Sequence, residues 1–507
     1  MTSALDAAWS AAWSDFLANR VALAERRTAP FLHTMPERLA AAAAENSVSA
    51  EQSAQSVASN MAEELVTLAD MAHIAGAVRG DDAVLRLALT AYQEHLRREP
   101  SNLAAMRMLA ETWLRLRQYS AAFAAFDRLY EASLAAAVSV EGRETAEVAP
   151  FQLIHDAECL EDAVALGADP AALTSAAGWR SVATWLQAQD ADATRRVALR
   201  DLSEAQRILL ASHGQPLPLL PIAPLAPAST RRALRADIDW REAMRTYAVR
   251  RVVVIDNILE PDALAELQAY VRHGAHFRTL RRGYLGAFPS DGTTHPLIQL
   301  LAEELSAAAP SIFGAHALAL WWIFKYDETN PAGIGIHADP AAVNLNIWLT
   351  DDGSCLEGGG LVVYSHVPPL ERETLSVNHV FESEAAEQAL RDKLTAEGSV
   401  LTIPYRCNRA AAFVSDQFHE SLPFTFRKGY HHRRANLTLL FGDRWSADDH
   451  RSAVESTAAV PREQLASQRG ESGILPTVKL EPPPPPGAPA LPSAGGQEGG
   501  GWDVFDF

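Results

Sequence analysis

A proline-rich stretch near the middle of the chain separates two segments of very different composition. QPLPLLPIAPLAPAS, residues 215–229, holds five prolines in fifteen positions. Each proline fixes φ and removes a backbone donor, so this stretch predicts a stiff, extended connector. We therefore expect a first region over residues 1–212, a Pro-rich linker over 213–230 and a second region that starts at residue 231.

The first region has the composition of an α-helical protein. It is rich in Ala, Leu, Glu, Arg and Gln, which favour helices. Over residues 103–136, large and small apolar residues recur at helical spacing on two helices, with a turn near Arg117–Ser120. This segment resembles a tetratricopeptide repeat, which implies a surface that binds a peptide or protein partner. A plain antiparallel bundle would show the same spacing, because stable repeat arrays normally need about three copies.

The second region is dominated by predicted strands. A helix opens at Pro261–Asp262, and loops with Gly, Asp, Asn or Pro separate most of the strands. The strand-like runs are RRVVVIDNIL (250–259), WWIFKY (321–326), VNLNIWLT (343–350), LVVY (361–364), VLTIPY (400–405), AAAFV (410–414) and ANLTLLF (435–441). Many strands with little helix between them indicate a sandwich or barrel over residues 231–446. The fold class we expect is therefore multidomain α + β. The low-complexity tail over 447–507 should be disordered.

Charge and apolar patterning exclude several function classes. The chain carries 63 acidic and 44 basic residues, a net charge of −19, so it repels polyanions and we expect no nucleic-acid or acidic-membrane partner. It has no apolar run long enough to span a bilayer. Because the start shows no signal peptide and the three cysteines form no framework, a reducing, cytoplasmic location is expected.

Three residues in the second region have the pattern of a metal site. His337 and Asp339 in IHADP are two apart, so on a strand both side chains leave the same face. His419 lies 82 residues later, directly after a strand. Two imidazoles and one carboxylate form the facial triad that holds iron(II) and leaves positions open. An H-x-D pair alone is weak, since a solvated loop pair arises by chance about once in such a chain.

Strand alternation places further polar residues near this triad. Arg434, Asn436 and Thr438 share one face of the last strand, while Leu437 and Leu439 share the other. On the strand at 343–350, Asn344 and Asn346 alternate with aliphatic residues in the same way. A polar cavity inside a barrel explains both patterns, although a half-exposed sheet would alternate similarly.

The stretch from about residue 250 to 444 resembles the iron(II)/2-oxoglutarate-dependent oxygenases of prolyl-4-hydroxylase-like type. The resemblance rests on FKYDETNPAGIGIHADPAAVNLNIWLTDD, EGGGLVVY, YRCNRAAAFVSDQFHE and YHHRRANLTLLFG, which occur in the family's order. It implies a double-stranded β-helix, or jelly-roll, with iron on His337, Asp339 and His419. Arg434 would then bind the distal carboxylate of 2-oxoglutarate.

The resemblance also implies an activity and further site residues. The family hydroxylates an unactivated C–H of a protein side chain or small molecule and releases succinate and CO2, with ascorbate as an accompanying reductant. Tyr326, Asn346 and Asn436 would lie beside the co-substrate; for Tyr326 and Asn346, a purely structural hydrogen bond is the alternative. The interval from His419 to Arg434 is longer than the family's usual spacing, so Arg433 competes for the role of Arg434.

Two questions stay open at the level of sequence. A catalytically inactive oxygenase-like scaffold, acting through its helical repeat region, is the alternative to an enzyme. A jelly-roll with another metal is a third reading, but it leaves Arg434 unexplained. The basic run FRKGYHHRR, residues 426–434, is interpreted as a solvated loop, with an anion-attracting rim as the alternative.

Overall fold

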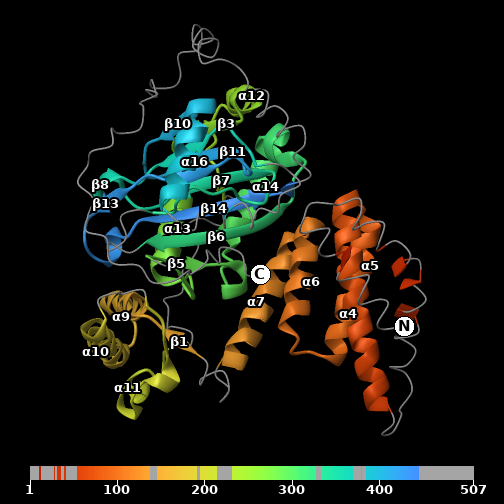
Figure 1. Ribbon diagram of the computed structural model, residues 1–507, viewed down its shortest axis with the longest axis horizontal. Helices are drawn as coiled ribbons and strands as arrows, with labels where there is room; N and C mark the ends of the chain where they lie inside the picture. Colours follow the sequence, from red (N-terminus) through yellow and green to blue (C-terminus); the bar gives the residue numbers. More distant parts are fainter. Residues whose placement is uncertain are drawn as a thin grey trace.

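The computed structural model describes residues 54–137, 146–190, 195–213, 231–281, 283–326, 333–368 and 384–444, with Asn378 and a few positions before residue 41 (Figure 1). The predicted linker, apart from His213, and the predicted disordered tail over 447–507 lie outside these residues. Within the described part of the chain, no helix is both long and apolar enough to cross a membrane.

The first region is helical, as predicted. Its helices are α4 (Ala54–Arg79), α5 (Asp82–Arg98), α6 (Leu103–Arg115), α7 (Tyr119–Ala137), α9 (Pro150–Ala165), α10 (Ala172–Gln189) and α11 (Glu204–Leu209). Polar side chains cap several N-termini: Asp81 accepts from the Ala83 amide before α5, and Asn102 accepts from the Ala105 amide before α6. The helix pair predicted over 103–136 is α6 and α7; its tetratricopeptide character stays a prediction.

Helix α7 packs against the strand region as well as against α6. The Phe123 ring stacks on the Trp321 indole at a centroid distance of 4.6 Å, and Phe126 meets the same indole edge-on at 5.7 Å. Phe126 belongs to one apolar core with Trp321, Ile323 and Leu318 of β6. This core joins the helices to the sheet.

The second region contains antiparallel sheets. Their strands are β3 (Val252–Ile255), β4 (Thr279–Arg281), β5 (Tyr284–Ala287), β6 (Leu318–Tyr326), β7 (Val343–Trp348), β8 (Cys355–Gly358), β9 (Leu361–Tyr364), β10 (Val400–Ile403), β11 (Ala410–Val414), β12 (His419–Ser421), β13 (Phe424–Phe426) and β14 (Ala435–Phe441). Each of the seven predicted strands is confirmed, with ends shifted by a few residues. Strands β4, β5, β8, β12 and β13 were not predicted, because they are short and lack a β-branched run.

From β6 onward, the chain crosses repeatedly between two facing sheets. Among the described residues, the larger sheet has the order β3-β11-β7-β14-β6-β5-β4, and a smaller one has the order β10-β9-β12. A bridge between His337 and His419 adds the segment around residue 337 to the edge of the smaller sheet beside β12. Trp348, Phe413 and Val363 fill the space between the sheets. Such alternation is the pattern of jelly-roll proteins.

Helices cover the outer faces of both sheets. Helices α12 (Trp240–Arg250), α13 (Pro261–His273) and α14 (Pro296–Ala308) bury the aliphatic side of the larger sheet. The start of α13 at Pro261 confirms the predicted helix. Helix α16 (Glu384–Glu397) was not predicted and lies on the smaller sheet, where Leu394 packs on Val362 and Ile336 (Figure 1).

Candidate metal centre

The fold brings His337, Asp339 and His419 together. One donor atom from each lies within 4.8 Å of the other two. The Asp339 carboxylate is 3.8 Å from Nε2 of His337 through one oxygen and 3.4 Å from Nε2 of His419 through the other. The spacing arises because His337 and His419 form a bridged pair on adjacent strands, while Asp339 follows two residues later on the same face.

Backbone hydrogen bonds fix the orientation of both imidazoles. Nδ1 of His337 donates to the carbonyl of Gly335 at 2.8 Å, and Nδ1 of His419 donates to the carbonyl of Gln417 at 2.8 Å. A carbonyl only accepts, so each Nδ1 carries the proton and each Nε2 presents a lone pair. Both lone pairs lie near the carboxylate of Asp339. The donor set therefore suits a divalent transition metal.

Burial sets the charge of this cluster. Desolvation, with the neighbouring His419, lowers the pKa of His337 to about 4, so this imidazole is neutral at physiological pH. Burial alone would raise the pKa of Asp339, but the neighbouring His419 and His337 and the hydrogen bond accepted from Asn344 hold that pKa below its usual range. Asp339 is thus a carboxylate, which offers only acceptor oxygens to the other members of the cluster.

A row of hydrogen-bonded side chains runs from Asp339 along the inner face of the larger sheet. We call Asn344, Asn346, Asn436 and Thr438 the polar row. Asn344 Nδ2 donates to Asp339 Oδ2 at 2.7 Å, and Asn346 Nδ2 donates to Asn344 Oδ1 at 2.8 Å. Oδ1 of Asn346 then accepts from Thr438 Oγ1 at 2.7 Å and from Asn436 Nδ2 at 3.3 Å.

The far end of the polar row is Arg434. Its Nη1 lies 3.5 Å from Asn436 Oδ1, while Nε and Nη2 donate to the Gly359 carbonyl at 3.1 and 3.0 Å. The guanidinium is buried and lies over the Tyr326 ring, 4.4 Å from its centroid. The predicted alternation is confirmed, since Leu437 and Leu439 point to the opposite, helix-covered side. Tyr326 is also buried against Phe424, and its ring supports the arginine.

Arg433 points away from the polar row. Its Nη2 pairs with Oε2 of Glu158 on α9 at 2.8 Å. Nearby, Nε2 of His431 is 2.7 Å from Asp162 on the same helix. Residues 431 and 433 of the segment 426–434, which was expected to be a solvated loop, therefore contact α9, while residues 427–429 are exposed. The reason is complementary charge: α9 presents carboxylates that the local sequence of the loop could not reveal.

The glycines at 358–360 allow a close chain approach next to Arg434. Gly358 and Gly359 have φ values of +68° and +77°, and a Cβ on Gly358 would lie 1.7 Å from the Pro423 carbonyl oxygen. Only glycine fits there, because a Cβ would clash with the facing backbone. The Gly359 carbonyl that results is the acceptor for Arg434. Sequence reasoning missed this backbone contact, and it left Asn344 out of the proposed site.

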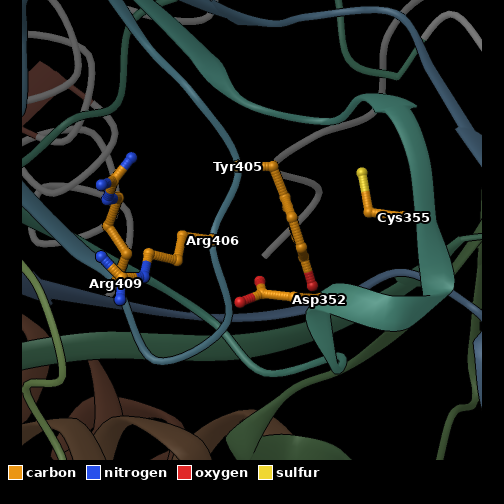
Figure 2. A pocket seen from close by; sticks show the side chains of 5 residues that line it. All are labelled: Asp352, Cys355, Tyr405, Arg406 and Arg409. Carbon is orange, nitrogen blue, oxygen red and sulfur yellow. The ribbon is translucent and has the colours of Figure 1, made fainter.

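A cavity of about 290 Å³ opens near the arginine end of the row (Figure 2). Asp352, Cys355, Tyr405, Arg406 and Arg409 line it. The Tyr405 ring stands in the middle of the view and also packs edge-on against Phe426 at 5.1 Å. Tyr405 would also contact a side chain at Gly359, so the cavity adjoins the turn that binds Arg434. Arg406 and Arg409 both pair with Asp256.

Comparisons with known proteins give distant similarities. No protein-family model matches the sequence, and no curated protein matches it. Among solved structures, a 2OG-Fe(II) oxygenase-family oxidoreductase from Burkholderia pseudomallei is 10% identical with a TM-score of 0.28, covering 42% of this chain and 98% of that one. A Pseudomonas putida prolyl-4-hydroxylase is 13% identical with a TM-score of 0.29, covering 40% of this chain and 98% of that one.

A third similar structure is the non-heme α-ketoglutarate-dependent epimerase SnoN of nogalamycin biosynthesis. It is 13% identical with a TM-score of 0.30, and the match covers 40% of this chain and 83% of that one. At such values the similarities carry no functional argument.

Proposed function

We propose that this protein is an iron(II)- and 2-oxoglutarate-dependent dioxygenase built on a double-stranded β-helix. The observation that carries the proposal is the polar row. It connects a two-histidine, one-carboxylate cluster to a buried arginine inside one barrel. A plain structural barrel has no need for a buried guanidinium and a charged triad at opposite ends of such a row, because burying them is costly.

The residues present fit iron(II). His337, Asp339 and His419 would hold it through two Nε2 atoms and a carboxylate oxygen, with the proton of each imidazole fixed on Nδ1. When bound, iron with three protein ligands supplies the oxidation of a C–H bond at its open positions. The protein's own contribution is to orient the ligands and to keep this site dry, since Asp339 and His419 are buried.

Arg434 fits the distal carboxylate of a dicarboxylic keto acid. Two of its nitrogens already donate to the Gly359 carbonyl, which holds the guanidinium plane fixed over Tyr326. A planar guanidinium in a buried site pairs strongly with carboxylate. Asn346 and Asn436 lie between Arg434 and Asp339, so they would line the co-substrate and hydrogen-bond to it. The co-substrate we propose is 2-oxoglutarate, which leaves as succinate and CO2.

The substrate is a protein side chain, as in prolyl hydroxylases, or a small molecule. The helical region supports a peptide or protein, because α4 to α7 form a layer beside the barrel and stacked helix pairs offer surfaces for extended chains (Figure 1). We propose the tetratricopeptide-like helices as the site of such a partner.

The test is co-substrate turnover by the purified full chain. With Fe(II), oxygen and 2-oxoglutarate, we expect slow release of succinate even without added substrate, and none from His337→Ala. Mass spectrometry of an incubated cell extract would then show which component gains oxygen. If the wild-type protein neither binds iron nor turns over 2-oxoglutarate across a broad substrate panel, the scaffold interpretation replaces this proposal.

A further inference from the structure

The segment that carries His337 and Asp339 lies at the edge of the smaller sheet, where an isolated bridge joins it to His419. On one side, the His337 amide donates to the His419 carbonyl at 2.9 Å and the His419 amide donates back at 2.8 Å. In an antiparallel ladder, neighbouring residues present their backbone groups to the opposite side. Ile336 and Ala338 therefore direct theirs away from His419, where the described residues provide no further strand. Such an edge has unpaired backbone N–H and C=O groups that need other partners.

Side chains from the connection between β9 and β10 occupy this edge. Asn378 Oδ1 accepts from the Ala338 amide at 3.1 Å, and its Nδ2 donates to the Ala338 carbonyl at 3.0 Å. Its carboxamide thus imitates a neighbouring strand residue, and it is 4% exposed. One turn into α16, Oε1 of Glu387 accepts from the Ile336 amide at 3.1 Å. Both contacts flank His337.

Helix α16 also holds the second histidine strand. Arg391 Nη2 donates to Glu387 Oε1 at 3.1 Å and to Glu420 Oε2 at 2.6 Å, and its Nε donates to Glu420 Oε1 at 2.9 Å. Glu420 follows His419 directly and also accepts from the Tyr364 hydroxyl. The bidentate pair is partly buried, so it is stronger than an exposed ion pair. Arg391 therefore links the two strands that bear the imidazoles.

We infer that Asn378, Glu387 and Arg391 form a brace that sets the separation of the two histidine strands and thereby the affinity of the metal site. This inference rests on the proposed function. The three are positioning residues, because they act through the backbone of Ile336 and Ala338 and through Glu420. Outer contacts of this kind commonly change metal affinity by about 10–100-fold. By linkage, a bound metal stabilises the brace to the same extent.

Gly335 is shaped for this arrangement. A Cβ at Gly335 would lie 2.5 Å from Oε1 of Glu387, the atom that accepts from the Ile336 amide. The Gly335 carbonyl accepts from Nδ1 of His337. Gly335 thus leaves space for the Glu387 carboxylate and, through its carbonyl, orients the imidazole of His337.

The experiment compares Co²⁺ binding to the full-length wild type, Asn378→Ala, Arg391→Ala, Glu387→Ala and Glu387→Gln. Titrations followed by the visible d–d absorption give the dissociation constant and report the ligand geometry. We expect roughly a tenfold weaker affinity for the three alanine variants. Glu387→Gln keeps the acceptor oxygen and should stay nearer the wild-type value.

The chain offers matched controls. Asn408 makes the same two hydrogen bonds to the backbone of Leu259, both at 2.9 Å, that Asn378 makes to Ala338. Arg180 on α10 forms a bidentate pair with Glu161 on α9, as Arg391 does with Glu420. Asn408→Ala and Arg180→Ala should lower stability without changing the Co²⁺ affinity. Equal Co²⁺ affinity for wild type, Asn378→Ala and Arg391→Ala overturns the brace. A loss of Co²⁺ affinity in the control variants as large as that in Asn378→Ala and Arg391→Ala also overturns it.

Amide hydrogen exchange on the metal-free protein separates this inference from the proposed function. We expect faster exchange over residues 335–339 in Asn378→Ala and wild-type exchange there in Asn408→Ala. Unchanged exchange at 335–339 in Asn378→Ala overturns the brace. A wild type that binds no Co²⁺ defeats the proposed function instead, and the exchange result still decides whether the edge is held.

Discussion

The adjacent residues Arg433 and Arg434 point to opposite sides of the larger sheet. Arg434 lies inside the barrel over Tyr326, and Arg433 pairs with Glu158 on α9 outside it. Because successive side chains of an extended segment point in opposite directions, the guanidinium of Arg434 lies inside the barrel and that of Arg433 contacts the helices.

The two arginines should respond differently to substitution. Arg434→Ala removes the cation that we propose for the distal carboxylate, so we expect the half-saturating 2-oxoglutarate concentration to rise at least about tenfold. For Arg434→Lys we expect a half-saturating concentration between those of the wild type and Arg434→Ala, because an ammonium group keeps the charge but cannot bind both carboxylate oxygens in one plane. Arg433→Ala should leave that concentration unchanged. Succinate release at varied 2-oxoglutarate provides the measurement, and equal shifts in both alanine variants would contradict the assignment.

Metal should stabilise the folded protein through His337. A ligand at a hundred times its dissociation constant contributes about 2.7 kcal/mol, which a thermal melt resolves. We expect the melting temperature of the wild type to rise with Co²⁺ and to return with a chelator. His337→Ala should show no rise. His432→Ala is the control, since its Nδ1 pairs with the Ser354 hydroxyl away from the triad; loss of the rise in His432→Ala would argue against the triad.

The two ends of the polar row should separate metal and co-substrate effects. Asn344 bonds to Asp339, whereas Asn436 lies beside Arg434. We expect Asn344→Ala to weaken Co²⁺ binding about tenfold or more. Asn436→Ala should mainly raise the 2-oxoglutarate requirement. Titration of each variant with Co²⁺ and with 2-oxoglutarate checks this. If Asn344→Ala affected 2-oxoglutarate and Asn436→Ala affected Co²⁺, the proposed positions of metal and co-substrate along the polar row would be wrong.

Lys325 should make stability depend on pH. Burial lowers its pKa from 10.5 to about 7, and its ammonium lies 4.3 Å from the Phe277 ring centroid. Between these two values the unfolded chain still holds the proton that the folded chain has lost, so stability rises with pH across this window. We expect Lys325→Met to abolish that rise relative to wild type. Urea unfolding at several pH values measures it, with the exposed Lys428→Met as control.

The contact between α7 and β6 should couple the helices to the barrel. Phe123→Ala removes a ring stacked on the buried Trp321, a change that costs about 3–5 kcal/mol in packed cores. We expect the free energy of unfolding in chemical denaturation to fall by that amount. The transitions followed by tryptophan fluorescence and by the circular dichroism of the helices should move to lower denaturant concentration together. Two separate transitions would show that the helical layer folds independently.

Local patterns were sufficient to predict most of the strands that carry the site, but not β12, the short strand that begins at His419. Alternation on β7 and β14 separated Asn346 and Asn436 from the aliphatic residues that face the helices, and the same rule favoured Arg434 over Arg433. The H-x-D spacing fixed two ligand candidates on one face. Each of these inferences needs only the period of a strand.

Contacts between distant segments could not be predicted in this way. Nothing near Asn378 indicates that its amide pairs with Ala338, because that contact spans 40 residues. The docking of Arg433 on Glu158 spans 275 residues. Helix α16, by contrast, could have been predicted, because its sequence EAAEQALRDKLTAE is rich in the Ala, Leu, Glu and Gln that favour helices.

The stacking of α7 on β6 has a practical consequence for anyone who shortens this chain. A fragment cut at the Pro-rich stretch and starting at Arg231 would uncover the indole of Trp321, which is 0% exposed in the intact protein. Bare aromatic surface of that kind drives self-association. The barrel should therefore be purified and crystallised with its helices attached.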